Sequence, residues 1–303
     1  MAKFTVAICT HNRADRLGQA LSSLQAATRP SRYEWEVLVV LNDCTDRSAE
    51  VAGSFLDRLP IVAVTETRRG LSHARNRAVE RSQGDFIVFI DDDVRVDAGF
   101  LVAYEDAFQK WPEDGVFSGP IVPVFEGEPP AWLKRVLPVV GSAYARQEVV
   151  RDGAPIDPAA PPFGANYAIR CSVQKRRRYD PDLGRGDVAW LRGGEETVLL
   201  AAVLAAGSGG RWVASASVAH VIEPKRQTLD YLERYYEGYG TLTGMTRRIQ
   251  RGGPPSAVGT FAEMVAAALV YRVERLVAPP ERWARAMVRA AVRRGRWKSR
   301  RMA

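Results

Sequence analysis

The stretch FIVFIDDDV, residues 86–94, determines how the rest of the sequence is interpreted, because a run of strand-forming apolar residues ends in three consecutive aspartates. A short apolar run of this kind predicts a buried strand. Adjacent like charges repel one another, and more strongly where a neighbouring core lowers the dielectric constant. We therefore expect the strand to leave the core at the aspartates and a positive group to face them there.

The sequence around this stretch alternates between strand and helix patterns, which predicts an α/β fold with a mostly parallel central sheet flanked by helices. Ligands of such sheets bind beyond the carboxyl ends of the strands. Polar clusters follow three of the expected strands, so we expect these clusters to meet in one crevice. The strands are expected at 5–9, 36–41, 61–65 and 86–90, the helices at 14–27, 46–59 and 71–82, and the clusters are THNR at 10–13, NDCTD at 42–46 and DDD at 91–93.

The second part of the chain is less regular until about residue 222 and purely helical afterwards. Residues 193–207 predict a helix and residues 211–220 a strand. Beyond Pro224 the periodicity predicts helices only, at 228–239, at 261–277 and from 280 onward. We therefore divide the chain into an α/β domain, 1–222, and a C-terminal helical extension, 223–303.

The composition is that of an ordinary globular protein, with 46% hydrophobic and 26% charged residues among 303. The three cysteines lack metal-ligand spacing and indicate a reducing compartment. No apolar run reaches the roughly 18 residues that a membrane span needs. We expect a cytoplasmic protein.

Most of the net charge of +8 is concentrated at the C-terminus, where residues 282–301 carry nine Lys or Arg and no acidic residue. A nucleic-acid-binding protein would more often spread its basic residues over a groove, so we expect no nucleic-acid partner. Apolar residues alternate with the arginines, which is typical of a helix that lies on an anionic membrane surface. The alternative is a core-packed helix with a basic end.

The three aspartates suggest a metal site. In an extended segment Asp91 and Asp93 would point to the same side and could hold one Mn²⁺ or Mg²⁺, while Asp92 faces away or touches a sugar. The alternative is an acidic turn that caps a helix.

Five motifs in order resemble those of the family 2 glycosyltransferases, which are inverting enzymes with the GT-A nucleotide-sugar-binding fold. They are T-x-N-R at 10–13, N-D-x-T-D at 42–46, G-L-S-x-A-R-N at 70–76, G-A-N at 164–166 and G-G-E-E at 193–196. The resemblance covers residues 4–222. It implies a nucleotide-binding half, 1–98, and an acceptor half, 99–222, of a GT-A catalytic domain.

The resemblance also implies roles for individual residues at the metal and the nucleotide. The aspartates resemble the motif that joins a divalent ion to the donor diphosphate; we assign Asp91 and Asp93 as ligands, with His220 completing the site. Leu41 stands where relatives carry the first acidic residue of the second motif, so Asn42 or Asp43 would meet the base. The remaining expected contacts to the nucleotide or sugar are Thr10, Asn12, Arg13, Arg75, Asn76, Asp92 and Asn166.

The catalytic base would come from the G-G-E-E motif, where relatives usually have Glu-Asp with the second residue as base. We therefore assign Glu196, with Glu195 as the second choice. The alternative is that both residues favour the positive end of the helix that follows.

The function implied is metal-dependent transfer of a sugar from a nucleoside diphosphate donor, UDP by preference, to a hydroxyl acceptor. A lipid-linked or cell-envelope glycan would suit the basic C-terminal helix, which would place the enzyme on the inner face of the membrane. Two alternatives stay open: a non-catalytic nucleotide-sugar-binding protein and a sugar nucleotidyltransferase. The second lacks a Gly-rich loop after Cys9.

Overall fold

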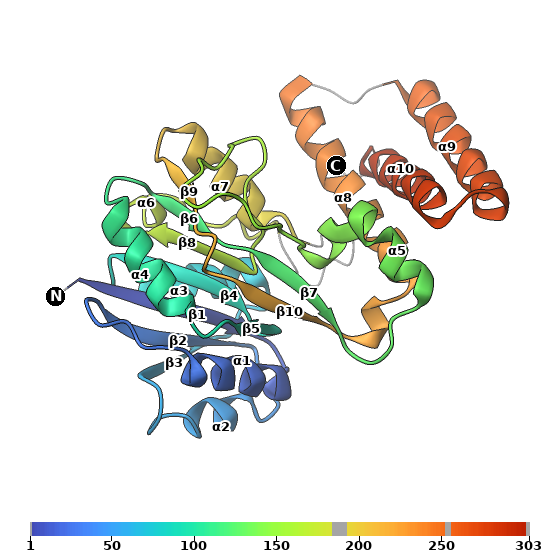
Figure 1. Cartoon of the computed structure of the whole chain (residues 1–303). Helices are drawn as coiled ribbons and strands as arrows, with labels where there is room; N and C mark the ends of the chain where they lie inside the picture. The colour runs from blue at the N-terminus through green and yellow to red at the C-terminus, as the bar shows by residue number, and fades with distance from the viewer. Residues whose placement is uncertain (1, 184–192, 252–255, 301–303) are drawn as a thin grey trace. The chain divides into compact units, whose positions relative to one another are not determined.

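The computed structural model describes residues 2–183, 193–251 and 256–300, and the chain divides into two compact units (Figure 1). Unit 1 contains the described residues up to 124, from 145 to 183 and from 193 to 221. Unit 2 contains residues 125–144 and the described residues from 222 onward. Unit 2 thus includes the predicted helical extension and, in addition, residues 125–144, which the sequence prediction assigns to the α/β domain.

Unit 1 is built on a seven-stranded sheet of order β3-β2-β1-β4-β8-β6-β9. The first four of these strands run parallel, β8 is antiparallel to both β4 and β6, and β9 is parallel to β6. The predicted α/β fold with a mostly parallel sheet is confirmed. The strands are β1 (Lys3–Thr10), β2 (Glu34–Asn42), β3 (Ile61–Glu66), β4 (Phe86–Asp91), β6 (Val116–Ser118), β8 (Asn166–Arg170) and β9 (Gly210–Trp212).

Helices cover both faces of this sheet. Successive strand residues point to opposite sides, so apolar residues in a continuous run must be buried on both faces. Val6 and Ile8 of β1 lie in one core cluster and Ala7 between them lies in the other. The first cluster contains the apolar residues of α1 and α4, and the second contains those of α3 and α7. The helices of unit 1 are α1 (Ala14–Ala26), α2 (Ser48–Gly53), α3 (Leu71–Arg81), α4 (Phe100–Lys110), α6 (Cys171–Gln174) and α7 (Glu195–Ala205).

The strand register brings the polar clusters together at one edge of the sheet. Thr10 of β1 pairs with Leu41 of β2, and Cys9 pairs with Asp91 of β4, so the carboxyl ends of these parallel strands are level. The convergence expected from the sequence is therefore confirmed.

A three-stranded sheet of order β5-β10-β7 adjoins the acidic cluster. Its strands are β5 (Val94–Val96), β7 (Ile121–Phe125) and β10 (Val218–Ile222). The single strand predicted at 211–220 is wrong, since β9 and β10 belong to different sheets. The chain turns between them, where the Ala216 carbonyl accepts a hydrogen bond from Asn166 Nδ2 at 2.7 Å. His220 consequently lies opposite Val94 of β5, next to the aspartates.

Unit 2 is helical and has its own core. Its helices are α5 (Ala131–Val140), α8 (Leu229–Arg251), α9 (Ala257–Val277) and α10 (Pro280–Ser299), with short 3₁₀ turns η1 (Gly141–Tyr144) and η2 (Pro224–Arg226). Leu133 and Val136 of α5 are fully buried with Leu232 of α8 and Met287 of α10. This shared core explains why residues 125–144 belong to unit 2.

The apolar side of α10 is not available to a membrane, which corrects one expectation. Ala284, Met287 and Ala291 are at most 1% exposed in the core of unit 2. The alternative of a core-packed basic helix therefore describes α10; Arg301, the last basic residue of the run, lies outside the described residues. Within the described ranges, no helix combines the length and the apolar character needed to cross a membrane.

Candidate functional site

The three aspartates form a turn rather than an extended segment. Asp91 is the last residue of β4, Asp92 and Asp93 make the turn, and β5 begins at Val94. The alternation that would align Asp91 with Asp93 therefore does not apply. Asp92 and Asp93 are only 5% and 4% exposed, and Asp93 Oδ1 lies 3.4 Å from His220 Nε2.

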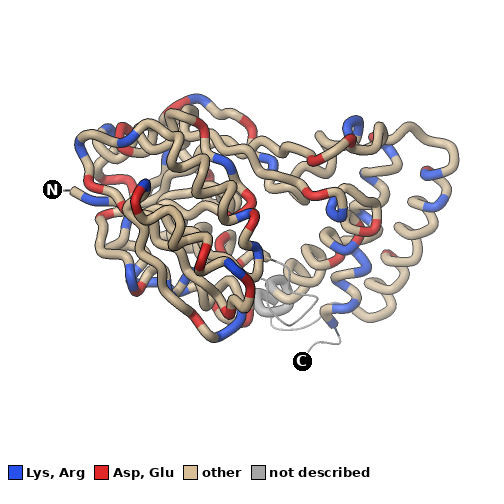
Figure 2. The backbone as a smooth tube through the Cα atoms, turned by 90° about the horizontal axis from the view of Figure 1, so that it is seen from below, with Lys and Arg blue, Asp and Glu red and all other residues tan. Residues whose placement is uncertain are grey.

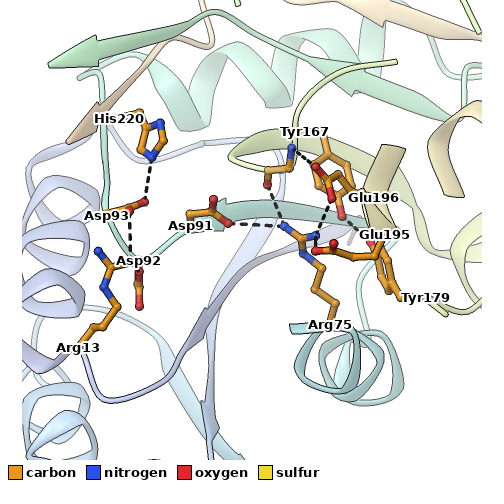
Figure 3. Close-up of polar contacts among 11 residues, drawn as sticks. Arg13, Arg75, Asp91, Asp92, Asp93, Tyr167, Tyr179, Glu195, Glu196 and His220 are labelled. Atoms are coloured by element: carbon orange, nitrogen blue, oxygen red, sulfur yellow. Dashed lines mark hydrogen bonds and ion pairs between the residues drawn. The ribbon is translucent and has the colours of Figure 1, made fainter. Parts of the chain in front are cut away.

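Arg13 is the positive group that faces this turn (Figure 3). Its Nη1 lies 2.7 Å from Asp92 Oδ1 and 3.2 Å from Asp93 Oδ2. Thr10 Oγ1 donates a hydrogen bond to Asp92 Oδ2 at 2.8 Å. Burial raises the pKa of Asp92 to about 7 and the charge of Asp93 adds to this, whereas Arg13 and Thr10 lower it. Thr10 and Arg13, which the resemblance assigns to the nucleotide, thus both contact the acidic turn in the structure.

A second charged cluster surrounds Arg75, which is 3% exposed (Figure 3). Arg75 Nη1 lies 2.5 Å from Glu195 Oε1 and 3.4 Å from Glu196 Oε2, and Nη2 lies 3.5 Å from Asp91 Oδ1. Burial disfavours the charged guanidinium, but the surrounding anionic groups raise the pKa of Arg75 above its usual value. One buried cation therefore links the acidic turn to the glutamate pair.

Gly164 allows this arrangement because its backbone approaches both charged groups. Its amide donates to Glu196 Oε1 at 3.3 Å, and its carbonyl accepts from Arg75 Nη2 at 3.4 Å. A Cβ atom at this position would lie 2.5 Å from Arg75 Nη2 and 3.1 Å from Glu196 Cδ. This lack of space for a side chain explains why a glycine stands first in the G-A-N motif.

The two glutamates differ in accessibility at the start of α7. The side chain of Glu195 is 1% exposed and that of Glu196 is 13% exposed. Gly193 and Gly194 precede them with φ of 90° and 103°, a region that favours glycine. Glu196 is therefore the more accessible of the two carboxylates.

A pocket of about 250 Å³ lies at the carboxyl ends of β1, β2 and β4. Cys9 lies in the wall of this pocket, and burial raises the pKa of its thiol to about 12. The lining residues are Cys9, Thr10, His11, Arg13, Asn42, Arg69, Gly70, Leu71, Ala74 and the three aspartates.

Asn42 borders the pocket but uses its amide to hold the loop after β3. Its Nδ2 donates to the carbonyls of Glu66 and Arg68 at 3.1 and 2.8 Å, and its Oδ1 accepts from the Gly70 amide at 2.9 Å. Asp43 is exposed, has a φ of 48° and does not line the pocket. Of the two residues expected at the base, Asn42 is thus a wall of the pocket and Asp43 lies outside it.

Four other residues expected at the nucleotide or sugar have hydrogen-bond or ion-pair partners within the protein. Arg75 is enclosed by carboxylates, as described above. Asn76 bonds the amide and the carbonyl of Tyr179 at 2.9 and 2.8 Å. Asn166 is 0% exposed and bonds Tyr104 and two carbonyls. Asn12 Oδ1 accepts from the amide of Thr45 at 2.7 Å and so joins two loops.

Sequence reasoning missed His11, Arg69 and Gly70. His11 Nδ1 lies 2.7 Å from the Asn42 carbonyl, which ties the loops after β1 and β2 together. A signal was present, because His11 lies inside the T-x-N-R motif and Arg69 and Gly70 immediately precede α3. Cationic and backbone N–H groups at such a loop suit a phosphate.

The donor set at the acidic turn suits a hard divalent cation, since carboxylate oxygens and an imidazole are present. Across the described ranges, however, no three or more His, Cys, Asp or Glu side chains are already arranged to hold a metal ion. Asp91 is turned toward Arg75, and Asp93 toward Arg13 and His220. The chemistry therefore fits, while the side chains are engaged with other partners.

Comparison with known proteins gives a consistent result. Residues 5–157 match the family model described as Glycosyl transferase family 2. The succinoglycan biosynthesis protein ExoM of Rhizobium meliloti is 25% identical over 238 residues, which cover 76% of this chain and 70% of ExoM. The poly(ribitol-phosphate) β-N-acetylglucosaminyltransferase TarS of Staphylococcus aureus is 32% identical over 95 residues, 31% of this chain and only 16% of TarS.

Solved structures agree on the fold. Residues 1–349 of S. aureus TarS in complex with UDP-GlcNAc match 97% of this chain and 90% of that chain, with a TM-score of 0.58 and 15% identity. The mannosyltransferase PcManGT of Pyrobaculum calidifontis, in complex with GDP-Man and Mn²⁺, matches 96% of this chain and 86% of that chain, with a TM-score of 0.60 and 18% identity. These similarities confirm the GT-A fold.

Proposed function

Because the chain belongs to glycosyl transferase family 2, and so is a glycosyltransferase that acts on nucleotide sugars, we propose that it transfers a sugar with inversion to a hydroxyl acceptor. The observation that carries this proposal is the link made by Arg75. Its guanidinium holds Asp91 of the acidic turn and the glutamate pair of α7 within 3.5 Å. A group that binds the donor and a group that activates the acceptor thus adjoin in one unit.

Glu196 is the proposed base. An acceptor hydroxyl attacks the anomeric carbon of the donor, the bond from that carbon to the phosphate oxygen breaks, and the hydroxyl proton passes to Glu196. A general base of this kind typically contributes ~10²- to 10⁴-fold in rate. Glu195, which is almost fully buried beside Arg75, holds the guanidinium and does not meet the acceptor.

The leaving nucleoside diphosphate is the group that needs positive charge. Asp91, Asp93 and His220 would hold a Mn²⁺ or Mg²⁺, with Asp92 beside them. When bound, the ion acts as a Lewis acid toward the diphosphate. Arg13 and Arg69 line the same pocket and would contact phosphate oxygens as Arg13 leaves the aspartates.

The donor base would occupy the pocket beside Asn42 and Gly70. We propose a UDP-sugar first, because a carboxylate such as that of Asp43 would accept the N3–H of uracil if its exposed loop moved toward the pocket. GDP is the other nucleotide to test, since TarS was solved with UDP-GlcNAc and PcManGT with GDP-Man. The names of ExoM and TarS make a cell-envelope or lipid-linked glycan our proposed acceptor class.

Calorimetry tests the donor site. We expect UDP or GDP to bind with Mn²⁺ present, and Asp93→Asn to weaken this binding at least tenfold. Asp57→Asn changes an exposed carboxylate elsewhere in unit 1 and serves as the matched control. If neither nucleotide binds under any condition, the proposal is wrong.

Donor hydrolysis or transfer by Glu196→Gln separates catalysis from binding. An enzyme that uses Glu196 as base should bind the donor normally and lose ~10²-fold or more of its kcat. Unchanged turnover would favour Glu195 or a different base. Donor binding without any turnover in the native chain would favour the non-catalytic alternative.

A further inference from the structure

The helix α9 (Ala257–Val277) has an apolar side that is largely exposed in the described chain; at its N-terminal end Phe261, half exposed, also contacts Trp297 of α10. Leu269, in the middle of the helix, is 56% exposed, and Leu276 near its end is 86% exposed. The exposed apolar residues recur every three or four positions, so they lie on one side of the helix. They are Val258, Phe261, Val265, Leu269, Val273 and Leu276, with Val270 and Val277 beside them.

The opposite side of α9 packs against the core of unit 2. Tyr271 is 7% exposed in the core of unit 2, and Ala267 packs against that core. The exposed side of α9 therefore does not need to be apolar for unit 2 to pack. Soluble proteins rarely expose contiguous apolar patches of more than a few hundred Å², and larger ones mark interaction surfaces.

The charges around this apolar side are unbalanced. Both acidic residues of α9 are paired with α10: Glu263 Oε2 lies 2.5 Å from Arg293 Nη1, and Glu274 Oε1 lies 3.2 Å from Arg282 Nε. The remaining charged residues of α9, Arg272 and Arg275, are both exposed and basic.

The neighbouring helix adds to this positive rim. Arg285 and Arg289 of α10 are exposed, and residues 282–300 of the described chain contain no acidic residue. Figure 2 shows the contrast between the few charged residues of α9 and the many basic residues of α10. An apolar strip beside basic side chains is the pattern of a helix that lies in a membrane interface.

We propose that α9 binds the surface of a membrane containing anionic lipids, with its apolar side among the acyl chains and the arginines at the headgroups. A helix of 21 residues is about 31 Å long and would lie in the plane of the surface. A second copy of the chain is a less suitable partner. A two-fold interface would place the same patch on both sides and so bring the basic rims together.

This inference is independent of the transfer reaction and replaces the membrane contact that the sequence placed on α10. The test is co-sedimentation of the full chain with vesicles of phosphatidylcholine alone or with phosphatidylglycerol. We expect binding only to the anionic vesicles. Leu269→Glu and Leu276→Glu should each lower the partition coefficient about tenfold or more, and replacing Arg285 and Arg289 by Gln should lower it about fivefold per arginine.

Val149→Glu is the matched control, because Val149 is also a largely exposed valine (71%) but belongs to unit 1. Circular dichroism establishes that each variant is folded. If Leu269→Glu does not fold, Leu276→Glu at the more exposed position tests the proposal. Lack of binding to anionic vesicles, or equal binding by the α9 variants, would overturn the proposal. A dimer in light scattering that Leu269→Glu dissociates, without vesicle binding, would assign the surface to a second copy instead.

Discussion

Arg13 Nη1 lies 2.7 Å from Asp92 Oδ1, so the acidic turn of the glycosyltransferase has an internal counter-ion before any metal binds. The same atom lies 3.2 Å from Asp93 Oδ2. A divalent cation bound at these oxygens would compete with the guanidinium and would have to displace or rearrange Arg13. The positive charge of Arg13 explains how these adjacent aspartates are tolerated beside the core.

Arg13→Gln should make the protein less stable and more responsive to metal. Without the guanidinium, two nearly buried carboxylates repel one another, which we expect to cost about 1–3 kcal/mol of unfolding free energy. Mn²⁺ should then raise the melting temperature more in Arg13→Gln than in the native protein. Differential scanning fluorimetry with and without Mn²⁺ measures this, with Arg16→Gln at a half-buried position of α1 as control. Equal metal-induced shifts would contradict the competition.

Arg75 is proposed as a positioning residue that fixes Glu196, and its substitution should affect turnover and stability differently. Arg75→Met would leave three carboxylates around an uncharged side chain and should cost about 3–5 kcal/mol in chemical denaturation. Arg75→Lys keeps the charge but not the forked geometry. We therefore expect Arg75→Lys to fold, to lower kcat at least tenfold and to leave the donor KM within a few-fold.

The control for Arg75 is Arg77→Met on the same helix, where an exposed pair with Glu80 at 3.5 Å contributes little. A purely structural role for Arg75 would lower stability in the lysine variant without changing the pH profile of kcat. A role in positioning the base should shift that profile.

Gly164→Ala should damage catalysis more than stability. The added methyl group would lie 2.5 Å from Arg75 Nη2 and 3.1 Å from Glu196 Cδ, so at least one of these groups must move. We expect kcat to fall ~10-fold to 10²-fold, because small displacements of reacting groups are costly. Gly99→Ala, where no atom lies within 4 Å of the added Cβ, should leave kcat unchanged. Native turnover by Gly164→Ala would show that the close approach of Gly164 to Arg75 and Glu196 is not needed for catalysis.

The sequence was sufficient to predict the parallel half of the sheet and its polar edge. β1, β2 and β4 are short apolar runs that each end in a polar cluster, and the periodicity of α1 and α3 is local information. The division of residues 211–220 between two sheets was not predictable in this way. It depends on Asn166 reaching the Ala216 carbonyl, a contact between residues 50 positions apart in the chain.

The candidate site was predictable by location but less so by role. Asp92, Arg13 and Thr10 were named from motifs, and they do meet at the acidic turn. Arg75 and Asn166 were assigned to ligands because polar residues in motifs suggest recognition. Their burial and partners are properties of the folded structure, and a motif cannot distinguish a residue that touches a ligand from one that holds its neighbour.

The raised pKa of Asp92, about 7, predicts how metal affinity depends on pH. A divalent cation prefers ionised carboxylates, so proton and metal compete at the turn. The affinity for Mn²⁺ should rise as the pH approaches about 7 and level off above it. Calorimetry at several pH values measures this, and Asp92→Asn should flatten the dependence. An identical slope in that variant would assign the titration to another group.

The same shift has a consequence for stability without metal. In the unfolded chain Asp92 ionises near its usual pKa, so between about pH 4 and pH 7 the folded state binds the extra proton. This group therefore makes the metal-free protein less stable as the pH rises through that range. The slope should be smaller in Asp92→Asn.

The contribution of Glu66 to stability should depend on pH in the opposite direction to that of Asp92. Its carboxylate accepts hydrogen bonds from the Arg68 side chain at 3.0 and 2.9 Å and from the Arg68 amide at 2.8 Å. The side-chain hydrogen bonds are the main reason that the pKa of Glu66 is lowered to about 2, although burial raises it. Stability from this group is present above about pH 4.5 and is lost as the pH falls toward 2. Because Arg68 is largely exposed, Glu66→Gln should cost only about 1 kcal/mol at pH 7.

Urea denaturation at pH 7 and pH 3 measures the Glu66 contribution, with the exposed Glu34→Gln as control. The difference between Glu66→Gln and the native protein should shrink at pH 3. Glu66→Gln should also weaken nucleotide binding modestly, since the carbonyls of Glu66 and Arg68 orient Asn42 at the wall of the pocket. A stability difference that stays constant with pH, together with unchanged binding, would mean that the loop after β3 is held by its backbone alone.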